Sequence, residues 1–130
     1  MTTTLEYMNN LYPALSKDYK TEDGKYSESC YCIAINIAKR LLDEGKSPYI
    51  IEIYGKLKDD VNRESIIPKP FNGRVIWGAH QICCEDNFAY DPMISAAPVS
   101  LEDYFKIAFE GNVEKKISMP KERMSKFFGK

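Results

Sequence analysis

Two cysteines lie at the start of one predicted helix, where a thiol can act as a nucleophile. The stretch SESCYCIAINIAKRLLDEG, residues 27–45, places Cys30 first and Cys32 two positions later. A thiol in the first helical turn feels the positive end of the helix dipole and the free N–H groups, which favour thiolate. The same N–H groups can receive the oxyanion of a tetrahedral intermediate. Positions two apart are turned by about 200° around the helix. Only one thiol can therefore face a given partner, and we expect it to be Cys30.

The single histidine of the chain, His80, has an acidic partner at hairpin spacing. It lies in the strand-like run VIWGAHQICCE, and Asp91 ends the next strand-like run, NFAYDP. Residues near the open ends of two paired arms come side by side. A carboxylate there can hydrogen-bond one imidazole nitrogen and leave the other free to take a proton from a thiol. The residues thus predict a Cys30–His80–Asp91 catalytic site that uses no cofactor and no metal.

Hydrophobic periodicity and turn residues predict the helices and strands around this site. A capping serine, Ser100, precedes a helix that ends at Gly111, and Gly45 ends the cysteine-bearing helix. Ser27 or Ser29 can cap the start of that helix. We expect Pro13 to end or kink the first helix. The expected order is a helix over 3–15, a loop over 16–29, a helix over 30–44, a strand over 49–57, a loop over 58–74, strands over 75–85 and 87–92, a helix over 101–110 and a short helix over 120–130. Helices followed by neighbouring strands indicate an α+β fold with an antiparallel sheet.

Composition limits the classes of function. Apolar residues make up 44% of the chain and charged residues 28%, with a formal net charge of −1 and scattered basic residues. We therefore expect no nucleic-acid partner. The apolar stretches are too short to span a bilayer, and MTTTLEYMNN lacks the features of a signal peptide. We expect a cytoplasmic protein with reduced thiols and no membrane partner.

The other cysteines favour packing over metal binding. Cys83 and Cys84 are adjacent in a predicted strand and should point to opposite faces of the sheet. Structural zinc sites instead need cysteines two to four residues apart on a turn.

Several of these residues resemble a known superfamily. Cys30, Ala34, Leu41-Leu42, Gly45 and Pro48 resemble the active-site helix of transglutaminase-like proteins. The stretch WGAHQICCEDNFAYDP resembles the histidine and aspartate strands of the papain-like Cys-His-Asp core. The Asp91-Pro92 ending, followed by a serine-capped helix, is similar to bacteriocin-processing double-glycine peptidases and bacterial protein glutaminases.

The resemblance covers residues 26 to about 109 and carries implications for fold and activity. It implies one papain-like domain over 1–130, with a core at about 26–110 and a C-terminal extension over 111–130. In such a domain the nucleophile-bearing helix packs on a small antiparallel sheet. The implied activity is hydrolysis or acyl transfer at an amide or thioester bond, as in a peptidase, protein glutaminase or transglutaminase. The partner would be a protein or peptide substrate or a small amide, and the loop over 57–73 would border the groove.

A second interpretation stays open, in which the fold is catalytically silent and serves as a protein-interaction module. Many papain-like enzymes place a Gln or Asn ahead of the nucleophile to complete the oxyanion hole. No Gln or Asn lies between Leu11 and Cys30. Tyr19, Tyr26 or the backbone N–H of Cys30 would have to donate instead.

Overall fold

The fold is mixed α+β, and the described part of the chain forms four α-helices and one antiparallel sheet. A computed structural model describes residues 3–18, 30–71 and 76–129. The elements in chain order are α1 (Thr4–Asp18), α2 (Cys30–Asp43), β1 (Pro48–Tyr54), the 3-10 helix η2 (Lys69–Phe71), β2 (Ala79–Glu85), β3 (Phe88–Tyr90), β4 (Val99–Ser100), α3 (Leu101–Ala108), β5 (Glu114–Met119) and α4 (Lys121–Phe127).

The sheet has the strand order β4-β3-β2-β1-β5, and every neighbouring pair is antiparallel. Strand β2 lies in the middle, with β1 on one side and β3 on the other. Its register pairs His80 with Ile53 and Cys83 with Tyr90. The expected hairpin of the histidine and aspartate arms is therefore confirmed.

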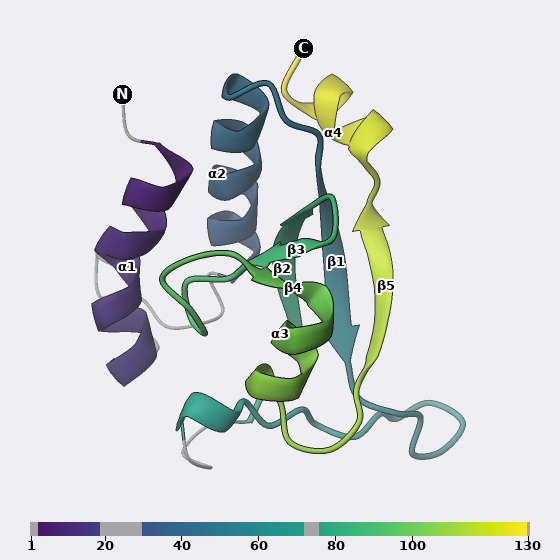
Figure 1. The fold of residues 1–130 in the computed structure, drawn as a ribbon. Coiled ribbons are helices and arrows are strands. Elements are labelled where there is room, and N and C mark those ends of the chain that lie inside the picture. The colour runs from purple at the N-terminus through teal and green to yellow at the C-terminus, as the bar shows by residue number, and fades with distance from the viewer. Residues whose placement is uncertain (1–2, 19–29, 72–75, 130) are drawn as a thin grey trace.

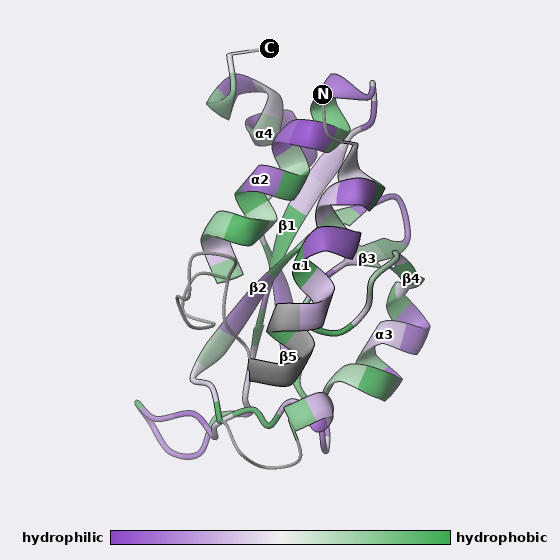
Figure 2. Cartoon of the chain, turned by 90° about the vertical axis from the view of Figure 1, so that its left-hand side faces the viewer, coloured by the Kyte–Doolittle hydropathy of each residue, from purple (hydrophilic) through white to green (hydrophobic). Residues whose placement is uncertain are grey.

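The two faces of the sheet bury separate cores, because side chains alternate along each strand. Helices α1 and α2 cover one face, where Ile50 and Cys83 join their apolar residues (Figures 1 and 2). Helix α3 packs on the other face, where Ile82 and Cys84 meet Tyr104. Cys83 and Cys84 point to opposite faces, as the sequence predicted, and both are fully buried.

The boundaries of α2 follow from its sequence. Gly45 adopts a positive φ of 82°, which L side chains rarely tolerate. The N–H of Lys46 then donates to the Leu41 carbonyl at 2.9 Å, which satisfies a carbonyl at the helix end. The predicted end of this helix is confirmed, whereas its candidate caps Ser27 and Ser29 lie outside the described residues.

Helix α1 is longer than expected. It runs to Asp18 and Pro13 lies inside it, so of the two predicted effects of Pro13, an end or a kink, the end is wrong. Proline removes one backbone donor and disfavours the helix interior. Leu11 and Leu15, on either side of Pro13, are buried in the core, and this packing outweighs the local penalty.

Two strands escaped prediction. Strand β5 lies in the segment assigned to the C-terminal extension and pairs with β1 at the edge of the sheet. Its sequence, EKKISM, lacks the alternation of a half-buried strand, and lysines are common on edge strands because they oppose aggregation. Strand β4 is two residues long and directly precedes α3.

The loop after β1 is more ordered than a plain surface loop. Ile66 and Trp77 exchange backbone hydrogen bonds of 2.8 and 2.9 Å, and η2 buries Phe71. These contacts hold the loop against the segment that leads into β2. Within the described residues, no helix has the length and apolar composition needed to cross a bilayer.

The N-terminal cap of α3 gives a first testable prediction. The Ser100 hydroxyl accepts a 3.2 Å hydrogen bond from the Asp103 N–H. Ser100→Ala should lower the free energy of unfolding by about 1 kcal/mol, because it leaves a helix-start donor without its partner. Urea unfolding monitored by circular dichroism measures the change. Ser65→Ala, at an exposed loop position, is the matched control, and an equal loss in both variants would contradict the capping role.

Candidate active site

His80 and Asp91 form a buried hydrogen-bonded pair. His80 lies near the start of β2, and Asp91 follows β3 directly. The imidazole Nε2 is 2.9 Å from the Asp91 Oδ2, and the two side chains are only 1% and 4% exposed. The hairpin thus brings together the histidine and the acid that the sequence singled out.

Asp91 is itself held by two further donors. The Tyr104 hydroxyl, from α3, donates to the same Oδ2 at 2.7 Å. The backbone N–H of Met93 donates to the other oxygen, Oδ1, at 3.0 Å. Both carboxylate oxygens therefore have partners, as a buried charge requires. The carboxylate is fixed in direction, and it fixes the imidazole in turn.

Cys30 is the first residue of α2 and completes the group. Its half-buried thiol lies in a narrow, tightly packed hollow that His80 and Asp91 also line. Burial raises the pKa of the thiol. The hydrogen bond and charge of His80, together with a hydrogen bond from the Gln81 backbone, lower it by more, so the net effect is a lowered pKa. Because Nε2 faces Asp91, Nδ1 is the ring nitrogen left for the thiol. The order is then thiol, imidazole, carboxylate.

The charge state of His80 follows from its partners. Burial lowers its pKa, but the charge and hydrogen bond of Asp91, with smaller contributions from Cys30, raise it to about 10. A raised histidine pKa and a lowered cysteine pKa both shift the pair toward thiolate and imidazolium. This shift favours a reactive nucleophile, because the thiolate is the attacking form of cysteine.

Aromatic rings enclose the imidazole. Trp77 stacks on His80 with ring centroids 4.4 Å apart and planes 20° apart, and Phe109 meets the imidazole edge-on at 6.1 Å. These rings exclude water from the imidazole and limit its rotation. The Trp77 Nε1 is buried and has no hydrogen-bond partner among the described residues.

The other cysteines differ from Cys30. Cys32 is exposed. Burial raises the pKa of Cys83 well above its ordinary value, and burial with the nearby Asp91 charge raises that of Cys84 to about 12. Within the described residues, no three His, Cys, Asp or Glu side chains are grouped as metal ligands.

Sequence reasoning missed three donors at this site. The sequence pattern of Tyr104 is that of an ordinary core aromatic in an amphipathic helix. Its position one turn after the Ser100 cap is the only signal in the sequence that indicates a place facing the sheet. The backbone N–H groups of Gln81 and Met93 carry no side-chain signal. The candidate oxyanion donors Tyr19 and Tyr26 lie outside the described residues.

No protein-family model matches this chain, and comparisons with curated proteins and with solved structures found no significant match.

Selective alkylation tests the state of Cys30. An ordinary thiol with a pKa of about 8.5 is almost wholly protonated at pH 6. Iodoacetamide at pH 6 should therefore label half-buried Cys30 before exposed Cys32, and the selectivity should narrow toward pH 9 as ordinary thiols ionise. Peptide mapping by mass spectrometry measures both rates.

Variants assign this reactivity. Cys30→Ser should remove the fast phase, whereas Cys32→Ser should retain it. His80→Ala should slow the alkylation of Cys30 at least about tenfold, because the thiol loses the cation that lowers its pKa. Equal labelling of Cys30 and Cys32 at pH 6 would contradict the ion pair.

Tyr104→Phe tests the support of Asp91. The variant removes the 2.7 Å bond and should lower the free energy of unfolding by about 1.5–3 kcal/mol, the range for hydrogen bonds to charged groups. It should also slow Cys30 alkylation at pH 6, because a looser carboxylate holds the imidazole less firmly. Tyr49→Phe removes another 2.7 Å hydroxyl bond, to the Asp86 carbonyl, and is the control. Unchanged alkylation in Tyr104→Phe would show that the hydroxyl is only structural.

Proposed function

We propose that this chain is a papain-like cysteine hydrolase or acyltransferase in which Cys30, His80 and Asp91 are the catalytic residues. The observation that carries the proposal is the position of the buried His80. Its imidazole is hydrogen-bonded to Asp91 and also hydrogen-bonds the Cys30 thiol, whose pKa it lowers. Nucleophile, base and orienting acid in this order are the requirement for thiol-based acyl transfer. The α+β architecture, with the cysteine at the start of a helix packed on an antiparallel sheet, fits the proposal.

The first half of the reaction forms a thioester. The Cys30 thiolate attacks the carbonyl carbon of an amide or thioester, and the carbonyl electrons move to oxygen. The first N–H groups of α2, which have no partner within the helix, receive this oxyanion. His80 then gives its proton to the leaving amine or thiol as the bond to carbon breaks.

The second half restores the enzyme. Water, or an amine in a transfer reaction, gives a proton to His80 as it attacks the acyl-thioester. Collapse of the intermediate releases the acid or the new amide, and His80 and Cys30 return to their ion pair. Asp91 remains bonded to Nε2 throughout and stabilises the imidazolium.

The surroundings of the site favour a protein or peptide substrate. The hollow beside Cys30 is too tightly packed to enclose a small ligand. Strand β1 ends at Tyr54, which pairs with Ala79 beside His80, so the following loop leaves the sheet at the site. This loop exposes Leu57 and Val61, at 61% and 84%, and could contact an extended substrate.

Acylation measured by intact-mass spectrometry tests this function. Incubation with an N-acetyl amino-acid thioester should produce an acyl adduct on Cys30 and continuing release of free thiol. Turnover should be absent in Cys30→Ala and lower by about 10²–10⁴-fold in His80→Ala, which lacks the base. Cys32→Ser is the matched control and should retain turnover.

The same variants, assayed on further substrates, separate an active enzyme from a catalytically silent interaction module. Ammonia release from glutamine-bearing proteins and cleavage of a peptide library extend the assay to amide substrates. Selective labelling of Cys30 without turnover on thioester, glutamine or peptide substrates would contradict the enzyme and support a catalytically silent interaction module.

A further inference from the structure

One face of the His80 imidazole is covered by the ring of Trp77. The two ring centroids are 4.4 Å apart and the ring planes differ by 20°, so the rings are stacked rather than edge-on. The electron-rich face of an indole attracts a cation within about 6 Å of its centre, and the attraction is stronger where water is excluded. A protonated imidazole in this place therefore gains an attraction that a neutral imidazole largely lacks.

The rest of Trp77 is fixed by contacts that leave its ring face on the imidazole. Its backbone N–H and carbonyl exchange hydrogen bonds of 2.9 and 2.8 Å with Ile66. Phe71 and Phe109 meet the indole in edge contacts, with centroid distances of 5.9 and 6.2 Å. The indole Nε1 is buried without a hydrogen-bond partner among the described residues, although a buried indole N–H usually has one. The stack on the imidazole is thus kept although this donor stays unpaired.

The other groups around His80 act on its charge in different ways. Among the described residues, Asp91 after β3 and Cys30 at the start of α2 are the ionisable groups that hydrogen-bond the imidazole. Tyr104, on α3, donates to Asp91. Phe109, which follows α3, is uncharged, and its ring is inclined by 65° to the imidazole at 6.1 Å. The parallel indole face is therefore an influence separate from the carboxylate and the thiol.

We propose that Trp77 is a positioning residue whose indole face holds His80 in its imidazolium form and thereby maintains the thiolate of Cys30. Its importance for catalysis rests on the proposed function, whereas the stack itself does not depend on turnover. A ring that served only as a water shield would have the opposite effect. Loss of a shield hydrates the imidazolium and raises the pKa of His80, whereas loss of an attractive ring face lowers it.

Fluorination of the indole tests the stack with little change in shape. Trp77 is the single tryptophan of the chain, so 5-fluorotryptophan and 4,5,6,7-tetrafluorotryptophan at this position withdraw electron density from one ring face only. Because Nε1 has no partner, the replacement breaks no hydrogen bond. Nitrogen-15 NMR of the imidazole should show a stepwise fall in the pKa of His80, from about 10 to about 9 in the tetrafluoro form. A pKa that is unchanged or raised along the series would overturn the proposal.

The same series in Cys30→Ser separates this inference from the proposed function. The variant lacks the nucleophile, but its ring and imidazole are unaltered, so the stepwise fall in the pKa of His80 should persist. A wild-type chain without turnover whose His80 pKa follows fluorination would support the stack and contradict the enzyme alone. Turnover with a His80 pKa that ignores fluorination would contradict the role of Trp77 alone.

Alkylation of Cys30 gives an independent check. Trp77→Leu should slow the reaction at pH 6 by about three- to tenfold, because a less stable imidazolium leaves less thiolate. Trp77→Phe, which keeps an aromatic face, should have a smaller effect. The fluorinated chains keep the test decisive if either variant fails to fold.

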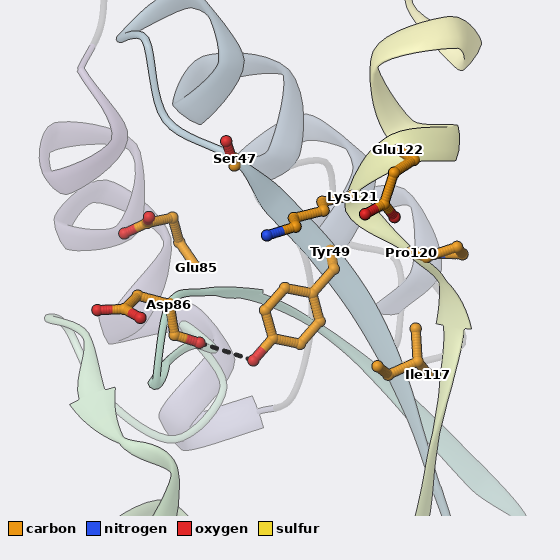
Figure 3. A pocket seen from close by; sticks show the side chains of 8 residues that line it. All are labelled: Ser47, Tyr49, Glu85, Asp86, Ile117, Pro120, Lys121 and Glu122. Atoms are coloured by element: carbon orange, nitrogen blue, oxygen red, sulfur yellow. Dashed lines mark hydrogen bonds between the residues drawn. The ribbon is translucent and has the colours of Figure 1, made fainter.

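Tyr49→Leu is the matched control for the loss of a half-buried aromatic ring. Tyr49 lines a cavity at the opposite end of the sheet, where its hydroxyl donates to the Asp86 carbonyl (Figure 3). Four positions of β1 separate it from Ile53, the partner of His80, which is about 14 Å along the strand. Its alkylation rate at Cys30 should match that of the wild type. Equal slowing in Tyr49→Leu and Trp77→Leu would indicate general loosening of the fold and would overturn the role of Trp77.

Discussion

The buried hydrogen bond between His80 and Asp91 links the sheet, α3 and the start of α2. A carboxylate that is 4% exposed is costly unless its oxygens are paired. The β2–β3 hairpin brings the acid to the histidine, α3 supplies the Tyr104 hydroxyl, and the chain after Asp91 supplies the Met93 N–H. Three separate parts of the fold thus satisfy one charge, and the charge in turn fixes their arrangement.

The same bond connects the fold to the chemistry of Cys30. Asp91 raises the pKa of His80 to about 10, and the imidazolium lowers the pKa of the thiol that opens α2. The helix start, the imidazole and the backbone N–H of Gln81 all act on one sulfur atom. Trp77 and Phe109 keep water from the imidazole, which strengthens each of these electrostatic interactions.

Sequence patterns predicted much of this arrangement, and the exceptions have physical reasons. Helix α2 was predicted from its apolar face and from the glycine at its end. Strand β2 was predicted from the run around Cys83 and Cys84. Both elements are buried, and burial produces such sequence patterns. Strand β5 was missed because an exposed edge strand has no buried face to produce a pattern. The prediction that Pro13 can end α1 failed because tertiary packing overrides a local preference. Residue types and spacing predicted the group of Cys30, His80 and Asp91. The Tyr104 hydroxyl was missed because it reaches Asp91 through a tertiary contact, which spacing alone does not reveal.

The protonation state of His80 is the decisive measurement, because His80 is the single histidine of the chain and its ring signals are unambiguous. Nitrogen-15 NMR of the imidazole ring, recorded from pH 5 to pH 11, reports both ring nitrogens. We predict a doubly protonated ring at pH 7 that loses its proton only near pH 10. A ring that is neutral at pH 7 and titrates near the ordinary value of about 6.5 would contradict the thiolate–imidazolium pair.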